Sequence, residues 1–284
     1  MSESIKSRSL IARALRTWRM QVGLAVTGIV VAVAVLGPQF APRDPQEFVG
    51  MPFQPPGNGF IFGTDYLGHD VLSMFLSGGW LLLVLALLGT IVGVGGGALL
   101  GILAGYSRGK LDEVIMRLGD VMLAFPQLIL ALLFISITGP NLAVIVLLTG
   151  LGHMPRVARV MRGASVAVSE RDFVANASAM GMPTRVIVLR EVLPNVTGPL
   201  AVEFGLRLTY SIGLIAGLSF LGLGVQPPTP DWGVMLNDNR VAFTLQPWPV
   251  ILPVLAISLV TIGMNLITDA LARASAGIDR EVQA

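Results

Sequence analysis

The sequence predicts an all-α protein that crosses a membrane several times, and both composition and hydropathy support this fold class. The chain has 284 residues, of which 54% are hydrophobic and 13% are charged, whereas soluble domains carry about 25% charged residues. Six apolar stretches have lengths that suit a membrane-spanning helix. Lipid is therefore expected to be the main solvent of this chain.

The composition also excludes several kinds of chemistry. The chain has no cysteine, so disulfides, iron–sulfur clusters and thiol catalysis are excluded. Its two histidines, His69 and His153, lie far apart in the sequence, which argues against a histidine-based metal site.

The N-terminal part is predicted to be a basic cytoplasmic tail, residues 1–21, followed by a first membrane-spanning helix over residues 22–41. No charge interrupts the run from Val22 to Leu36. A cleaved signal peptide is the alternative interpretation. The basic lead is long and the apolar run extends to Phe40, so a retained first span is favoured.

Residues 42–79 are rich in Pro, Gly and acidic residues and are predicted to form a loop on the outer side of the membrane. An amphipathic helix is expected to start within this loop, capped by Thr64 or Asp65. Asp65, His69 and Asp70 together suggest a metal site, but helical residues five apart do not share a face well, which argues against one.

Residues 80–272 are predicted to form a core of five helices, of which the second span, residues 80–106, has a regular glycine pattern. Glycine recurs at every fourth residue: Gly89, Gly93, Gly97, Gly101 and Gly105. A stripe of this kind on one helix face lets the backbone of another helix approach closely.

The chain contains no complete nucleotide-binding motif. The glycines around Gly93 lie inside an apolar run of spanning length, which excludes a dinucleotide-binding loop. Residues 107–117 are predicted to be a short basic turn, in which Gly109 and Lys110 resemble part of a phosphate loop. Ala104 and Leu111 stand where that motif needs Gly and Ser or Thr, so it is not present.

The remaining spans follow from hydropathy. They are residues 118–138, with Pro126 inside; 142 to about 155, extended into water by Arg156, Arg159 and Arg162; 199–223; and 250–268. A Pro-rich loop, residues 224–249, precedes the last span, and residues 273–284 form a short polar tail.

The segment between the fourth and fifth spans is predicted to be a helix, a glycine turn and a second helix. Ser169 and Asp172 resemble a capping box at a helix start. Gly181 can adopt the left-handed conformation that ends a helix, and a second helix is expected to stop near Pro194.

The positive residues predict the sides of the membrane. Sixteen of the 19 Lys and Arg residues fall in residues 1–21, 106–117, 154–197 and 269–284. Because positive residues stay cytoplasmic, both termini and the segment around Gly181 are expected in the cytoplasm. Both termini lie on the same side only if the number of spans is even, so six spans agree with this placement, whereas five would not.

Two charges lie inside the fifth span. Glu203 and Arg207 are four residues apart and so share one helix face, where they should pair or face a wet interior. A pair that lines a transport pathway and a purely structural pair are both compatible with the sequence. Asp120, Asn265 and Asp269 are expected to hydrogen-bond between helices near the cytoplasmic ends of their spans.

Several motifs together resemble one known family: the permease subunits of bacterial ABC importers for dipeptides, oligopeptides and nickel, in particular the second permease of each pair. The similar segments are Phe62–Asp70, in which His69 replaces the usual arginine; Ser219–Gly233; and Asn265–Asp269. The resemblance covers nearly the whole chain and implies the type I ABC importer permease fold.

The resemblance also implies that the cytoplasmic loop over residues 163–197 couples the permease to an ATPase. Ala177, Gly181 and Pro194 match the coupling motif of the family, whereas Ala175 replaces its glutamate and Asn176 its first alanine. The coupling residues expected from this similarity are Asp172, Phe173, Ala175, Asn176, Ala177, Met180, Gly181, Arg185 and Pro194.

The partners implied by the resemblance are a second permease, two ATPase subunits or an ATPase dimer, and an extracytoplasmic substrate-binding protein, with no nucleic acid. The chain itself would be no enzyme and hold no cofactor, because ATP and magnesium would bind to the ATPases. The expected location is the bacterial inner membrane.

Di- or oligopeptides are the expected substrates. Nickel or another small solute is the alternative, and a standalone secondary transporter is a further one, although paired inverted repeats with broken helices are not evident.

Overall fold

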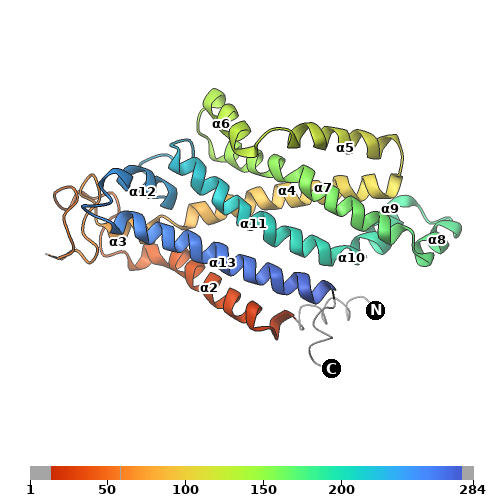
Figure 1. Cartoon of the computed structure of the whole chain (residues 1–284), viewed down its shortest axis with the longest axis horizontal. Helices are drawn as coiled ribbons and strands as arrows, with labels where there is room; N and C mark the ends of the chain where they lie inside the picture. Colours follow the sequence, from red (N-terminus) through yellow and green to blue (C-terminus); the bar gives the residue numbers. More distant parts are fainter. Residues whose placement is uncertain (1–13, 58, 277–284) are drawn as a thin grey trace.

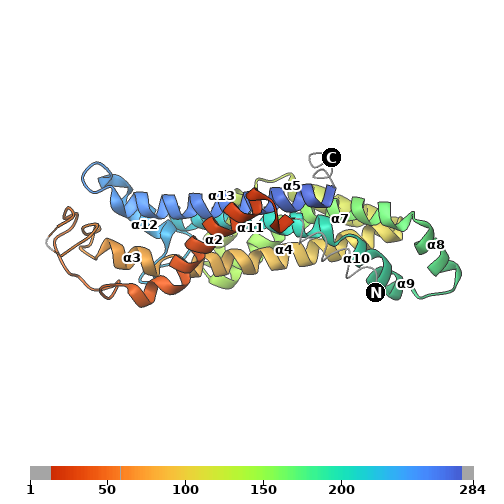
Figure 2. The same cartoon turned by 90° about the horizontal axis from the view of Figure 1, so that it is seen from below.

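The computed structural model describes residues 14–57 and 59–276, which form an elongated bundle of helices (Figure 1). The helices are α2 Trp18–Leu36, α3 Val71–Ser77, α4 Trp80–Ser107, α5 Lys110–Leu123, α6 Gln127–Thr138, α7 Leu142–Ser169, α8 Asp172–Ala179, α9 Thr184–Ile187, α10 Leu193–Asn195, α11 Thr197–Phe220, α12 Trp232–Asn239 and α13 Trp248–Ala276. In Figures 1 and 2, α8 lies at one end of the bundle and α3 and α12 at the other. These are named the α8 end and the α12 end below.

The predicted all-α membrane fold is confirmed for the described residues. Five segments are long and apolar enough to cross a membrane: Trp18–Phe40, Val71–Ser107, Leu142–Ser169, Thr197–Phe220 and Trp248–Ser275. Helices α5 and α6 make a sixth only if both belong to one span, because they are bent by 80° relative to each other.

This bend corrects the predicted third span, which was expected to be one helix over residues 118–138. The break lies between Leu123 and Gln127, directly at Pro126. Proline has no amide hydrogen to donate and disfavours helical conformation in the residue before it, here Phe125. The predicted basic turn over residues 107–117 is also wrong, because α5 already begins at Lys110.

Helix ends differ from the predictions at both ends of the chain. Helix α2 begins at Trp18 rather than at residue 22, because the Thr17 hydroxyl caps it by accepting the Met20 amide at 3.3 Å. After Leu36 the chain continues as a short 3₁₀ helix, Gly37–Phe40. Helix α13 extends past the predicted limits at residues 268 and 272 to Ala276.

The glycine stripe of α4 packs directly against the backbone of α7, as predicted. A Cβ atom at Gly93 would lie 2.8 Å from the carbonyl oxygen of Gly150. At Gly101 it would clash with the carbonyl oxygen of Ala158, and at Gly105 it would lie 2.6 Å from the carbonyl oxygen of Arg162. Only glycine permits this approach, which we name the α4–α7 seam.

The loop before α3 is folded differently from the prediction. Asp70, not Thr64 or Asp65, caps this helix, and its Oδ2 accepts the Ser73 amide at 2.9 Å. Asp65 instead closes a turn by accepting the His69 amide at 2.8 Å, so the helix starts later than predicted. The described residues contain no group of three or more potential metal ligands.

Helix α12 lies within the segment predicted to be a loop, and it is tied to α3. The indole nitrogen of the buried Trp232 donates to the carbonyl oxygen of Phe75 at 2.9 Å. Asp231 caps α12 by accepting the amides of Gly233 and Val234 at 2.8 and 3.1 Å. Burial raises the pKa of Asp231 to about 6, and these amide hydrogen bonds oppose the rise.

A methyl group added at Gly101 should weaken the α4–α7 seam. Gly101→Ala is expected to destabilise the protein by about 1–3 kcal/mol through overpacking. Gly95→Ala is the matched control on the same helix, because its new Cβ would meet no atom within 4 Å. It should be neutral or slightly stabilising. Thermal unfolding in detergent compares the two, and equal midpoints would contradict the tight seam.

The buried Asp231 predicts that stability depends on pH. Its pKa of about 6 in the folded protein lies above the ordinary value of 3.8. The contribution of the neutral carboxyl to the free energy of unfolding is therefore fully present below pH 3.8 and is lost as the pH rises through 6. Asp231→Asn stays neutral, so its stability relative to the wild type should increase by up to about 3 kcal/mol between about pH 4 and pH 7. Unfolding midpoints over this range measure the difference; a constant difference would show that Asp231 is not the cause.

Candidate functional site

The segment at the α8 end consists of two short helices joined by a tight turn. Helix α8 ends in a pair of backbone hydrogen bonds, from Met182 to Ala177 at 3.2 Å and from Gly181 to Ser178 at 3.0 Å. This pattern is a Schellman motif, in which the residue after the helix adopts a left-handed conformation. Gly181 does so, with φ of +75°, which confirms its predicted role.

Two local predictions for this segment are wrong. Ser169 and Asp172 form no capping box, because Ser169 belongs to α7 and donates its hydroxyl to the Ser165 carbonyl at 2.8 Å. The second helix also does not stop near Pro194. Helix α9 continues through a π-helical turn, Val188–Val192, into α10, which has Pro194 in its first turn.

The segment is anchored to the bundle by its own apolar side chains. Val174, Ala177, Ile187 and Val192 are buried in one cluster with Val94 and Ile102 of α4 and Val157 and Met161 of α7. Because both helices of the segment contribute to this cluster, the segment is held rigidly on the α4–α7 seam.

The predicted coupling residues divide into an exposed and a buried set. Those that are exposed are Asp172, Ala175, Asn176, Met180, Gly181 and Arg185, while Phe173 and Pro194 are half-buried. Ala177 is only 4% exposed and packs against its own chain. Its side chain therefore packs inside the segment, while a contact of Ala177 with a partner stays a prediction.

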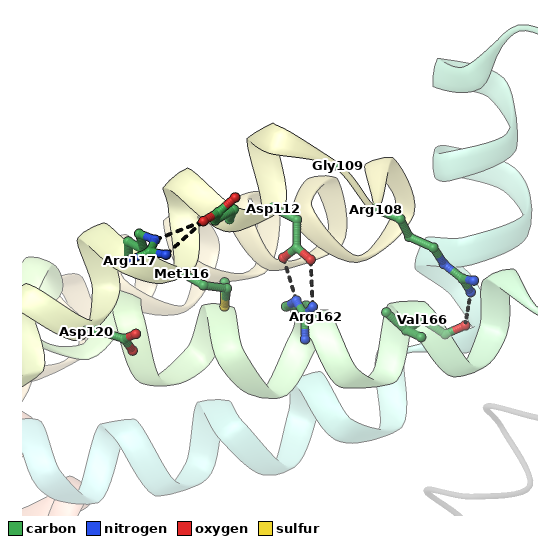
Figure 3. Close-up of a pocket in the computed structure, with 9 residues that line it drawn as sticks. Arg108, Gly109, Asp112, Met116, Arg117, Asp120, Arg162 and Val166 are labelled. Atoms are coloured by element: carbon green, nitrogen blue, oxygen red, sulfur yellow. Dashed lines mark hydrogen bonds and ion pairs between the residues drawn. The ribbon is translucent and has the colours of Figure 1, made fainter.

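An open charged cleft of about 640 Å³ lies between α5 and α7 (Figure 3). Figure 3 shows Asp112 and Arg162 facing each other across it, with Arg162 Nη2 2.6 Å from Asp112 Oδ2. Arg159 and Asp120 form a second pair between the same helices, also at 2.6 Å. These ion pairs fix α5 on α7. The other charged residues of the lining are also paired, Arg108 with Glu170 and Arg117 with Glu113, so the cleft's charges are satisfied internally.

The sequence interpretation missed Asp112, because the surrounding residues were assigned to a turn. Its position in the first turn of α5, where acids favour a helix start, is the signal that could have revealed it. The expected contacts of Asp120 and Asp269 between helices are confirmed. Asp269 lies 3.1 Å from Arg19 of α2 and thereby joins the first and last spans.

Glu203 and Arg207 form the predicted ion pair inside α11. Arg207 Nε donates to Glu203 Oε2 at 3.0 Å, and the two residues are 9% and 6% exposed. The guanidinium also lies over the ring of Tyr210, 5.4 Å from its centroid.

Tyr210 belongs to a groove of about 510 Å³ between α6, α7, α11 and α13. The polar residues that line it are Gln127, His153, Thr209, Tyr210, Thr261 and Asn265. The ion pair thus lies beside this groove, behind Tyr210, rather than among its lining residues.

A chain of hydrogen bonds reaches this groove from the bundle interior. Thr90 of α4, Ser211 of α11 and His153 of α7 are linked by contacts of 2.9 and 3.0 Å. No role was predicted for His153, which entered only in the argument against a histidine-based metal site. A polar residue in the middle of an apolar span was the signal for a further role.

These features define the class of protein: a multi-spanning membrane transport subunit with no nucleotide-binding motif in its sequence and a rigid exposed loop at one end. The sequence model of the family described as "Binding-protein-dependent transport system inner membrane component" matches residues 97–276. The chain belongs to this family, and it is an inner-membrane permease subunit of a binding-protein-dependent transport system.

Relatives support this assignment over most of the chain. The di/tripeptide transport system permease protein DppC of Pseudomonas aeruginosa is 38% identical over 256 residues, covering 88% of this chain and 84% of the relative. The glutathione transport system permease proteins GsiD of Pectobacterium atrosepticum and Escherichia coli are each 35% identical, covering 86% of this chain and 81% of the relative.

Removing one partner of the buried ion pair should destabilise the protein more than removing both charges. Glu203→Gln leaves Arg207 buried without its carboxylate and should cost about 3–5 kcal/mol. The double variant Glu203→Gln with Arg207→Met removes the unpaired charge and should recover most of that loss. Thermal unfolding in detergent or nanodiscs measures both variants. If the single variant is no less stable than the double variant, the charges do not depend on each other.

Proposed function

We propose that this chain is the permease subunit of an ATP-driven importer of di- or oligopeptides, in which it forms half of the translocation pathway. The observation that carries the proposal is the helical segment over residues 172–195, named the α8 loop. It is exposed, and it is anchored to the spanning helices of a permease without a nucleotide-binding motif. The peptide and glutathione permeases among its relatives support a peptide substrate.

We infer that the α8 end faces the cytoplasm. Among the described basic residues, Arg43 and Arg240 lie toward the α12 end and Arg207 lies within a span, whereas the others gather toward the α8 end. The positive-inside rule places such an end in the cytoplasm. The Arg19–Asp269 contact joins α2 to α13 near the same end, which supports cytoplasmic termini.

The coupling loop, residues 163–197, would dock on an ATPase subunit through its exposed residues. Met180 is 75% exposed next to Gly181, and no atom lies within 4 Å of a Cβ built at Gly181. Such a tip can enter a groove on a partner without rearranging its own chain. Ala175 and Asn176 lie on the same surface, whereas Ala177 would hold the loop on α4 and α7.

The proposed complex contains a second permease, two ATPase subunits or an ATPase dimer, and an extracytoplasmic binding protein. ATP and magnesium would bind to the ATPases. Closure of the ATPases would draw the coupling loops of the two permeases together. Since this loop and the α4–α7 seam share one apolar cluster, the displacement would be passed directly to the spanning helices.

The test is ATP-driven uptake of trialanine by the complete complex reconstituted in lipid vesicles. Gly181→Asp should reduce uptake by about tenfold or more, because it places an unpaired charge in the docked contact. Gly222→Asp is the matched control: Gly222 has φ of +78° and likewise no atom within 4 Å of an added Cβ. It lies beyond the other end of α11 and should retain more uptake.

Two results would contradict the proposal. Full uptake by an assembled Gly181→Asp complex would show that this loop does not couple the ATPase to transport. Uptake by the wild-type chain without ATPase subunits, driven by an ion gradient, would instead identify a secondary transporter.

A further inference from the structure

The groove between α6, α7, α11 and α13 lies close to the middle of the spanning helices. At a rise of about 1.5 Å per residue, His153 lies about 16 Å from the start of α7 at Leu142. Tyr210 lies about 15 Å from the end of α11 at Phe220. Both depths are near half the hydrocarbon thickness of about 30 Å. Polar side chains at this depth are costly and therefore mark functional positions.

The hydrogen-bond chain behind the groove determines which nitrogen of His153 carries the proton. The Thr90 hydroxyl donates its hydrogen to the Ala86 carbonyl at 2.7 Å, so toward Ser211 it can only accept. The Ser211 hydroxyl therefore donates to Thr90 and accepts from His153. Nε2 of His153, 3.0 Å from the Ser211 oxygen, must carry the hydrogen.

The other nitrogen of this imidazole is then a bare acceptor. Nδ1 of His153 is buried and has no hydrogen-bond partner within the described part of the chain. His153 is 2% exposed overall and lines the groove. A buried acceptor without a partner is costly, which indicates that a donor occupies this place when the groove is in use.

The remaining groove residues indicate what kind of donor fits. The lining offers the amides of Asn265 and Gln127 and the hydroxyls of Thr209, Tyr210 and Thr261, and no Asp, Glu, Lys or Arg is among the described lining residues. Two arginines lie behind this lining rather than in it. Arg156 donates to Gln127 Oε1 at 3.3 Å, and Arg207, which lies over Tyr210, is paired with Glu203 at 3.0 Å. A neutral group with both donors and acceptors matches this lining better than an ion.

We propose that the groove is a transient binding subsite for the amide backbone of the transported substrate, in which Nδ1 of His153 accepts one amide N–H. This inference rests on the proposed peptide-import function and assigns a position on the pathway to it. A single central acceptor with weakly polar surroundings can align an extended backbone without holding it tightly, as passage through a membrane requires.

Two substitutions of the same residue separate this role from a structural one. The side-chain amide of Asn can place its oxygen near the position of Nδ1, whereas that of Gln reaches the position of Nε2. His153→Gln keeps a donor for Ser211 but loses the groove acceptor, and uptake of trialanine by the reconstituted complex should fall about fivefold to tenfold. His153→Asn should retain more uptake than His153→Gln.

A second measurement uses a depsipeptide, the trialanine analogue in which ester oxygens replace the N–H groups of both peptide bonds. The wild-type complex should transport trialanine faster than this analogue. His153→Gln should reduce the ratio of the trialanine uptake rate to the analogue uptake rate. The same binding protein is used with each variant, so a change in the ratio originates in the permease. Thr149→Val is the control: the Thr149 hydroxyl is also buried without a partner in the described residues but does not line the groove, and uptake should stay unchanged.

The outcomes are distinguishable. If His153→Asn loses uptake and His153→Gln keeps it, the bond to Ser211 is what matters, and the subsite is overturned. An unchanged ratio in His153→Gln also overturns it. If the wild-type complex shows no ATP-driven uptake of either compound, the proposed peptide-import function fails, and this inference fails with it.

Discussion

The close backbone contact between α4 and α7 is the constraint on which the rest of this structure depends. Helices in lipid gain little from the hydrophobic effect when they associate, so van der Waals packing must hold them together. Glycines along α4 bring the two backbones together over about half of each helix, from Gly89 opposite Thr149 to Gly105 opposite Arg162. His153, the charged cleft beside α5 and the segment at the α8 end are all attached to this seam.

Helix α7 carries these features in order along its length. His153 lies at mid-depth beside the groove, Arg159 and Arg162 hold α5, and the helix then leads directly into the α8 loop. The helix therefore connects a polar site in the membrane with an exposed surface at one end. Pro155, which lies inside α7, does not divide it into two elements, since α7 is continuous from Leu142 to Ser169.

Regular patterns in the sequence predicted much of this fold, and local exceptions did not follow from them. The apolar runs, the glycine stripe and the pairing of Glu203 with Arg207 depend on periodicity and spacing, which are visible in one sequence. The bend at Pro126 was not predicted, because a proline within an apolar run can either kink a membrane helix or end it, and packing decides which. The helix beyond residue 268 buries Ala270 and Ala274 in a cluster with Ala14 and Met20, a contact between the two ends of the chain that only the tertiary structure reveals.

The candidate sites were predictable to different degrees for the same reason. The glycine turn at Gly181 is a local feature, and its conformation was correctly expected. The burial of Ala177 depends on contacts with residues distant in sequence, and the hydrogen-bond chain from Thr90 to His153 joins three helices. Such arrangements need the tertiary structure, because no spacing within the chain encodes which faces meet.

The anchored α8 loop has a mechanical consequence. With 28 residues, α7 is a rod about 42 Å long, and the loop is fixed at one end of it. If the rod pivots near its far end, a rotation of about 5° moves the loop by roughly 4 Å, a displacement of the size seen when helices shift between packed states. The groove beside His153, nearer the pivot, would move only about two fifths as far. With such a pivot, a large movement of the loop would produce a small change in the width of the groove.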